Sequence, residues 1–165
     1  MEAHRWLRAT VKPMDYRRQN HAVYYTRYHL VFTTKMRRKI IKGGMGQYCS
    51  YLVRSLPRRH PELRIIEVNT DQDHIHILLS IAPKVAVADA VKIIKANTAR
   101  MMKTKFPFLT TGYFDKQQVW SIGYFVSTSG ITEAVIKRYI ELQGQEDSGQ
   151  ARLELVSKDA TGGSP

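Results

Sequence analysis

The chain has 165 residues, of which 43% are hydrophobic and 24% are charged. This length and composition are typical of one globular domain and exclude a fibrous or wholly disordered protein. The 26 lysines and arginines outnumber the 14 aspartates and glutamates, and the net charge of +12 indicates a polyanionic partner. We recognise no membrane span or secretion signal, and Cys49 is a single cysteine. We therefore expect a cytoplasmic protein without a membrane partner.

The positive charge is concentrated in the N-terminal half, where residues 1–70 carry 15 basic and 4 acidic side chains. Residues 1–22 alternate charged and polar groups without a period, which predicts a mobile basic arm. Residues 24–28 then interleave tyrosines with Arg27, a pattern that suits stacking on the bases of unpaired nucleic acid. A solvated basic surface with no partner is the alternative.

Residues 23–143 contain the predicted domain. Four segments rich in β-branched or aromatic residues predict strands, at 23–34, 63–69, 74–81 and 119–126, with a bulge at Gly123 in the last. Three segments with apolar residues at helical spacing predict helices, at 48–56, 85–105 and 132–143, the last capped by Thr132. This order predicts an α+β domain with a mainly antiparallel sheet covered by helices, followed by an acidic, disordered tail over 144–165.

A run of basic residues follows the first predicted strand. Lys35, Arg37, Arg38 and Lys39 form a predicted turn there. Since lysine and arginine make most contacts to a nucleic-acid backbone, these four residues and Arg27 are the candidate DNA-binding side chains.

Two histidines stand in a predicted strand at alternate positions. His74 and His76 point to the same face about 7 Å apart, because side chains alternate along a strand. The pair can bind one metal ion, although two histidines at this spacing are more often ordinary residues of a polar strand face that bind no metal. Asp71 and Asp73 could add oxygen ligands, orient an imidazole or be turn residues, and the turn interpretation fits best.

A tyrosine and a glutamine share one face of the last predicted helix. Tyr139 and Gln143 are four residues apart and therefore lie about 6 Å from each other, whereas Glu141 points elsewhere. From this segment alone, a packing tyrosine and a solvated glutamine at the helix end are favoured. Other catalytic schemes have less support, because Cys49 has no acid–base partner nearby and the sequence has no P-loop, dinucleotide fingerprint or zinc ribbon.

Taken together, these motifs resemble a known family. They are Tyr28–Lys35 (YHLVFTTK), Asp73–Leu79 (DHIHILL), Trp120 ahead of Tyr124–Val126 (YFV), and Val135–Gln143 (VIKRYIELQ). In this order and at this spacing they are similar to the small TnpA-type, single-tyrosine HUH transposases, which are IS200-like. The resemblance covers residues 24–143.

The resemblance implies a ferredoxin-like or RRM-like fold and a transposase that cuts and rejoins single-stranded DNA. Tyr139 would attack a phosphodiester, hold the 5′ end as a phosphotyrosine and free a 3′-OH, without a nucleotide cofactor. His74, His76 and Gln143 would hold a divalent metal ion, Mg²⁺ or Mn²⁺. The expected partners are single-stranded DNA hairpins at transposon ends and a second copy of the chain, with the sheet continued across the homodimer.

Two other functions are weighed beside this one. The chain could be a non-catalytic module for single-stranded nucleic acid that uses Tyr24, Tyr25 and Tyr28 as a stacking platform. It could also be a metal-dependent nuclease that uses water as the nucleophile. Tyr124 is interpreted as structural, because Thr128 rather than glutamine stands four residues after it.

Overall fold

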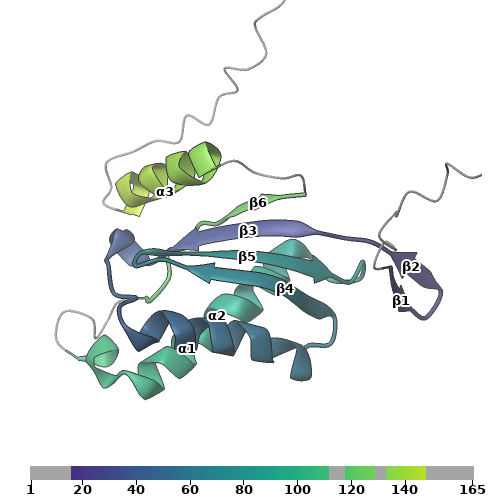
Figure 1. Ribbon diagram of the computed structural model, residues 1–165, viewed down its shortest axis with the longest axis horizontal. Helices are drawn as coiled ribbons and strands as arrows, with labels where there is room; N and C mark the ends of the chain where they lie inside the picture. The colour runs from purple at the N-terminus through teal and green to yellow at the C-terminus, as the bar shows by residue number, and fades with distance from the viewer. Residues whose placement is uncertain (1–15, 112–117, 129–132, 148–165) are drawn as a thin grey trace, which may run out of the picture.

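The computed structural model describes residues 16–111, 118–128 and 133–147 (Figure 1). The strands are β1 (Arg17–Gln19), β2 (Ala22–Tyr24), β3 (Tyr28–Thr33), β4 (Leu63–Thr70), β5 (His74–Ile81) and β6 (Phe125–Ser127). The helices are α1 (Gly44–Ser55), α2 (Val87–Lys105) and α3 (Glu133–Asp147), with short 3-10 helices η1 (Lys35–Arg37), η2 (Leu56–Arg58) and η3 (Pro107–Thr110). No helix in these residues is long and apolar enough to cross a membrane.

The main sheet has four strands in the order β4-β5-β3-β6, and every neighbouring pair is antiparallel. The chain leaves β3, forms α1 and returns as β4, while β5 fills the space between these two strands. This is the ferredoxin-like arrangement, in which two strand–helix–strand units interleave. The predicted α+β fold with a mainly antiparallel sheet is confirmed.

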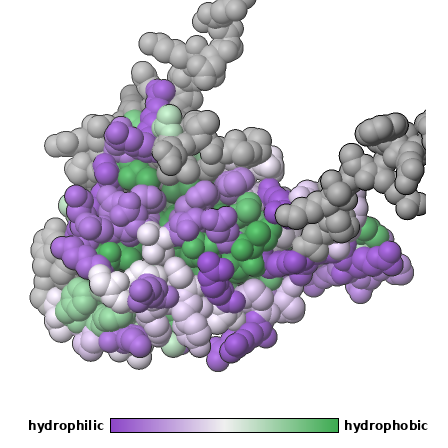
Figure 2. Space-filling view, in the orientation of Figure 1, coloured by the Kyte–Doolittle hydropathy of each residue, from purple (hydrophilic) through white to green (hydrophobic). Residues whose placement is uncertain are grey.

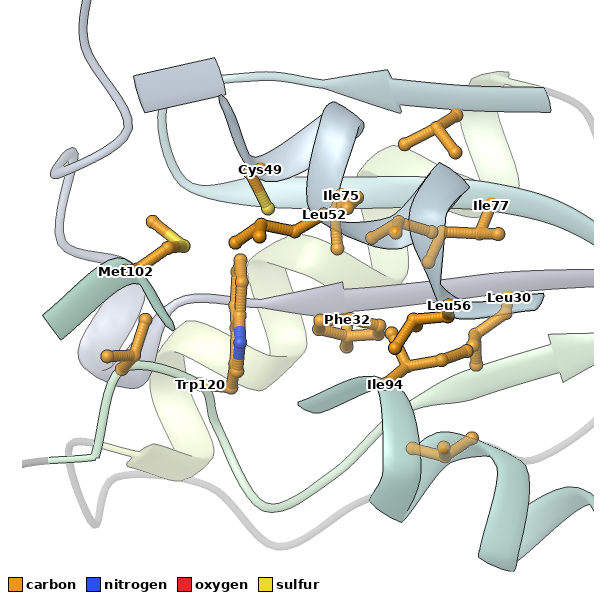
Figure 3. Close-up of a cluster of buried hydrophobic side chains, with 14 of the residues drawn as sticks. Leu30, Phe32, Cys49, Leu52, Leu56, Ile75, Ile77, Ile94, Met102 and Trp120 are labelled. Carbon is orange, nitrogen blue, oxygen red and sulfur yellow. The ribbon is translucent and has the colours of Figure 1, made fainter. Parts of the chain in front are cut away.

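One face of the sheet carries the hydrophobic core. Leu30 and Phe32 of β3 and the alternate apolar residues of β5 are buried against α1 and α2, and Figure 3 shows how these side chains meet. The Trp120 ring meets Phe32 edge-on at 4.9 Å between centroids, and its Nε1 donates to Thr98 Oγ1 at 2.9 Å. Burying one such large side chain stabilises the fold by roughly 1.5–3 kcal/mol.

Of the described helices, only α3 covers the opposite face of the sheet (Figure 1). There Val31 of β3 forms a small second cluster with Tyr139 and Ile140 of α3, and Phe125 of β6 packs against it. Because side chains alternate along a strand, this is also the face toward which His74 and His76 point. The fold therefore places the helix with the candidate nucleophile on the same side as the candidate metal ligands.

The predicted strand over 23–34 is wrong in its middle. The structure divides it into β2 and β3, because Thr26 Oγ1 donates to the Ile81 carbonyl oxygen at 2.7 Å and turns the chain toward the end of β5. β2 pairs instead with β1 in a separate two-stranded hairpin. Residues 17–22, predicted as part of an arm without regular structure, form one strand of this hairpin and begin the next.

The predicted strand over 119–126, with its bulge at Gly123, is also wrong. Trp120 forms an isolated bridge with Thr34, and regular pairing begins only at Phe125. The cause is Lys95 of α2, whose ammonium group donates to the carbonyl oxygens of residues 121–123 at 2.7–3.1 Å. These carbonyls consequently point at a lysine rather than at a neighbouring strand. The predicted cap at Thr132 lies outside the described residues.

The single cysteine, Cys49, lies in the core and is inaccessible to solvent. Its side chain is 0% exposed, and burial raises the pKa of its thiol to about 12. We expect the folded protein to resist alkylation by iodoacetamide at pH 8, because the reactive thiolate is both scarce and inaccessible. Mass spectrometry should show modification only when denaturant is added, and rapid modification of the native protein would contradict this burial.

Candidate functional site

A cavity of about 960 Å³ opens where the β4–β5 turn, the end of β3 and α3 meet. Its wall contains both basic and acidic side chains. The residues that line it include Arg37, Lys39, Asp73, His74, His76 and Lys137. The sequence predicted the two histidines as neighbours on one face, and the structure brings both to this cavity.

Asp73 links His74 to the basic turn. Its Oδ1 lies 2.9 Å from His74 Nδ1, and its Oδ2 lies 3.3 Å from a guanidinium nitrogen of Arg37. A carboxylate at Nδ1 fixes the proton there and leaves Nε2 with a free lone pair, which is a common support for metal-binding histidines. The interpretation of Asp73 as a simple turn residue is therefore wrong, whereas Asp71 does form a turn by accepting from the Gln72 backbone N–H.

The backbone that presents Arg37 is strained. Met36 and Arg37 have positive φ angles of 58° and 51°, a conformation that costs a non-glycine residue roughly 1–2 kcal/mol. Thr34 holds the turn in place: its N–H donates to the Asp73 carbonyl at 2.8 Å and its hydroxyl to the Arg38 carbonyl at 2.7 Å. The strained turn thus directs the Arg37 guanidinium to the carboxylate that holds His74.

His76 has a different partner. Its Nε2 lies 3.3 Å from Nδ1 of His29 on β3, and the two rings stack with centroids 5.5 Å apart. The pKa of His76 is lowered, first by burial and then by the neighbouring His29, although Glu67 opposes the shift. Since the neutral imidazole is the form that binds metal ions, this environment favours a ligand.

Tyr139 and Gln143 meet as their spacing predicted, but on the other side of α3. The Tyr139 hydroxyl donates to Gln143 Oε1 at 3.1 Å, and both side chains are buried, at 9% and 5% exposure. The Tyr139 ring packs against Phe125, with centroids 5.7 Å apart. The interpretation of Gln143 as a solvated helix end is therefore wrong.

The two pairs of residues do not share one cavity. The cavity that His74 and His76 line is closed on the α3 side by Lys137, Ile140 and other residues, and Tyr139 and Gln143 are not in its wall. Within the described residues, no three His, Cys, Asp or Glu side chains lie close enough to hold a metal ion together. The chain thus offers two imidazoles in the cavity, while the amide oxygen that would complete the predicted set faces β6.

The Gln143 carboxamide packs against the backbone of Gly123. A Cβ built at Gly123 would overlap the carboxamide oxygen of Gln143, so that any larger residue there must displace the Gln143 side chain. The carbonyl of Gly123 is in turn held by Lys95 Nζ at 2.7 Å. The segment 121–123 therefore contacts α3 through Gln143 on one side and is held by Lys95 of α2 on the other.

We expect Gly123→Ala to loosen α3 without unfolding the domain, because the new methyl displaces Gln143 while the core lies on the opposite face. Hydrogen exchange should show faster exchange of α3 amides, with β5 and α2 protected as before. Gly44→Ala is the matched control, since a Cβ there meets nothing within 4 Å. Unchanged exchange in α3 would contradict this role of Gly123.

The predicted DNA-binding residues lie at two separate places. Arg37 and Lys39 reach the cavity, whereas Arg27 lies at the far end of β3 with its guanidinium 5.1 Å from the centre of the Tyr25 ring. Arg38 supports the backbone instead, because it donates to the carbonyls of Lys35 and Gln118. Lys35 begins η1, beside Arg37.

Sequence reasoning missed His29 and the role of Gly123 in this site, and it favoured the wrong one of the roles it considered for Asp73. His29 lies inside a quoted motif, yet only the strand register shows that it reaches His76. Asp73 was recognised as a possible support for an imidazole, but its partner Arg37 is 36 residues away. Gly123 was read as a bulge, and nothing local in the sequence indicates that Gln143 rests on it.

Comparison with known proteins agrees with this architecture. The family model described as "Transposase IS200 like" matches residues 22–143. The chain is 32% identical over 135 residues to the transposase for insertion sequence element IS200 of Salmonella typhimurium, covering 82% of this chain and 88% of that protein. It is 29% identical over 138 residues to the ISDra2 transposase TnpA of Deinococcus radiodurans, covering 83% and 97%.

Among solved structures, a crystal structure assigned as a transposase of Deinococcus radiodurans superposes with a TM-score of 0.68 at 27% identity. The similarity covers 77% of this chain and 97% of that one. The matched residues 22–143 contain the histidine pair, its supporting turn and the Tyr139–Gln143 pair. On this evidence the chain belongs to the IS200-like transposase family.

Proposed function

We propose that this transposase cleaves and rejoins single-stranded DNA through a covalent bond to Tyr139. The phenol oxygen bonds to phosphorus as the bond from phosphorus to the 3′ oxygen breaks. The phenol gives up its proton and the 3′ oxygen takes one, so the step needs no nucleotide or redox partner. Attack of a 3′-OH on the phosphotyrosine reverses the step and rejoins the strand.

The observation that supports this proposal most is the placement of two unusual pairs on one face of the sheet. His74 and His76 line a cavity whose wall carries both basic and acidic side chains, and α3, which carries Tyr139 and Gln143, forms one side of that cavity. The buried Tyr139 hydroxyl donates to the buried Gln143, so the two side chains stay together on α3. In this proposal, α3 carries both the tyrosine and the glutamine to the histidines.

The same proposal assigns a divalent metal ion, Mg²⁺ or Mn²⁺, to His74, His76 and Gln143. His74 fits because Asp73 leaves its Nε2 free, and His76 fits because its environment favours the neutral ring. Gln143 can contribute its amide oxygen only after leaving Tyr139 and Gly123. Such an ion, when bound, polarises the scissile phosphate.

The proposed substrate is a single-stranded DNA hairpin at a transposon end. Lys39 and Lys137 line the cavity and are exposed, so they are suited to contact phosphates beside the cleavage site. The homodimer with a continued sheet is likewise a proposal, which sedimentation equilibrium of the full chain tests.

We expect Lys39→Gln with Lys137→Gln to weaken binding of a single strand and to reduce its salt dependence. Each lost phosphate contact should flatten the slope of log affinity against log salt by about 0.7. Fluorescence anisotropy at several salt concentrations measures the slope, and Lys84→Gln, an exposed lysine before α2, is the control. An unchanged slope in the double variant would remove these lysines from the DNA contact.

The decisive experiment incubates the protein with a labelled single-stranded hairpin and Mn²⁺, followed by denaturing electrophoresis. A labelled band at the mass of protein plus DNA supports the tyrosine mechanism. Cleaved DNA without that band supports a nuclease that uses water. Binding without cleavage supports a nucleic-acid-binding module, but Tyr24 is buried and Tyr28 is half-buried, so the three-tyrosine platform is not available as predicted.

A further inference from the structure

The hairpin of β1 and β2 stands apart from the main sheet, at the end away from the candidate active site (Figure 1). Its two strands pair Arg17 with Tyr24 and Arg18 with Val23. Since neighbouring side chains on a strand point to opposite faces, the hairpin has an inner face with Arg17 and Tyr24 and an outer face with Arg18 and Val23. These two faces differ sharply in their surroundings.

The inner face fastens the hairpin to the domain. The Arg17 guanidinium donates to the Pro61 carbonyl at 2.9 Å and lies 5.5 Å from the centre of the Tyr24 ring. Tyr24 itself is buried. The hairpin is therefore held in a defined position by the turn that precedes β4.

The outer face is exposed and aromatic. Tyr16 is 55% exposed, Val23 63% and Tyr25 42%, and the Tyr16 and Tyr25 rings meet edge to face at 6.0 Å. Exposing so many large side chains on one small ribbon is unfavourable unless a partner covers them. We call the set Tyr16, Arg18, Val23 and Tyr25 the outer hairpin face.

The charge around this face identifies the partner. Arg18 belongs to this face and Arg27 lies over the Tyr25 ring, while residues 16–28 contain no acidic residue. Figure 2 shows that this end of the surface is mostly hydrophilic around a small hydrophobic patch. Exposed aromatic rings beside guanidinium groups suit unpaired bases, which stack, together with the phosphates between them.

We propose that the outer hairpin face is a second binding site for single-stranded DNA, separate from the cavity with His74 and His76. This inference rests on the proposed use of unpaired DNA, but it concerns binding and not cleavage. Arg27 and Lys35 bracket β3, and eight residues at about 3.3 Å each place the two sites up to roughly 26 Å apart. At about 3.4 Å per stacked nucleotide, a strand of roughly eight nucleotides connects them.

The test measures the affinity of fluorescein-labelled oligothymidylates of 4 and 16 nucleotides for the full chain. The variant Tyr16→Leu with Tyr25→Leu removes the rings and keeps apolar side chains, and Tyr16→Phe with Tyr25→Phe keeps the rings. Tyr51→Leu is the control, because Tyr51 is 58% exposed on α1. Circular dichroism confirms that each variant is folded.

We expect the double leucine variant to bind the 16-mer at least roughly 5- to 150-fold more weakly, which is the range for losing one base stacked on an aromatic ring. The double phenylalanine variant and Tyr51→Leu should bind as the wild type does. The gain in affinity from 4 to 16 nucleotides should shrink in the leucine variant. Arg18→Gln should flatten the salt dependence by about 0.7.

Equal affinity of the wild type and the leucine variant for the 16-mer would overturn this inference, as would equal loss in the phenylalanine variant. A leucine variant that changes sedimentation but not DNA affinity would mark the face as a protein interface and would also overturn it. The Tyr139 adduct is a separate readout. If the wild type forms the adduct but the leucine variant binds the 16-mer with unchanged affinity, only the second site is refuted. If the leucine variant loses affinity but the wild type forms no adduct, only the cleavage mechanism is refuted.

Discussion

Replacing Tyr139 by phenylalanine is expected to abolish the covalent protein–DNA adduct. A phenyl ring has no atom that can bond to phosphorus, so adduct formation should fall by a factor on the order of 10⁴ or more. DNA binding should persist, because the Tyr139 side chain is buried between α3 and the sheet and does not line the cavity. Denaturing electrophoresis measures the adduct and fluorescence anisotropy the binding.

The substitution has a small structural cost that must be separated from the chemical one. Gln143 Oε1 loses the hydroxyl that donates to it in a buried place, which destabilises the fold by about 1–3 kcal/mol. Thermal unfolding of the variant therefore accompanies the activity measurement. A folded variant that binds DNA without forming the adduct identifies a lost nucleophile rather than a lost fold.

Tyr124→Phe is the matched control. This tyrosine is half-buried, with Lys95 Nζ 5.8 Å from the centre of its ring, and it has no glutamine four residues on. Its variant should still form the adduct. If the Tyr139 variant forms the adduct and the Tyr124 variant does not, the assignment of the nucleophile is wrong.

Local periodicity accounts for what the sequence predicted well. The bounds predicted for β5, 74–81, agree with those observed, because alternating apolar residues specify both the strand and its buried face. The alternation also places His74 and His76 on one side. In the same way, the helical repeat predicts that Tyr139 and Gln143 share one face of the helix, and the hydrogen bond between them confirms this.

Contacts between distant parts of the chain account for what the sequence left open. The segment 121–123 contains apolar residues typical of a strand, but Lys95, 26 residues from Ser121, captures its carbonyls. Arg37 and Asp73 are similarly remote from each other. The direction in which Tyr139 faces is set by Gly123 and by Phe125, so no helical pattern within α3 could reveal it.

We expect His74→Ala and His76→Ala each to abolish cleavage and to weaken Mn²⁺ binding strongly. Each substitution removes one of two imidazoles in the cavity, and the described residues contain no group of three His, Cys, Asp or Glu side chains that could hold the ion without it. Titration calorimetry or the Mn²⁺ electron paramagnetic resonance signal measures the affinity without DNA. Cleavage should likewise be lost in EDTA and restored by added Mn²⁺.

Asp73→Asn should have an intermediate effect. Asparagine can still accept from His74 Nδ1, but it lacks the charge that pairs with Arg37, so the imidazole is held less firmly. Loss of such a supporting group typically lowers metal affinity or activity by about 10- to 100-fold. The nitrogen chemical shifts of His74 should then report a mixture of the two ring tautomers, whereas the wild type should show one.

His60→Ala is the control for these variants, because His60 contacts Glu62 before β4 and does not line the cavity. The expected order of Mn²⁺ affinity is wild type and His60→Ala, then Asp73→Asn, then the two cavity histidines. Gln143→Ala should leave DNA-free Mn²⁺ affinity nearly unchanged, because Gln143 accepts from Tyr139 in this arrangement. Full cleavage in EDTA would refute the metal assignment. Equal Mn²⁺ affinity in Asp73→Asn and the wild type would show that Arg37 and Asp73 support only the fold of the turn.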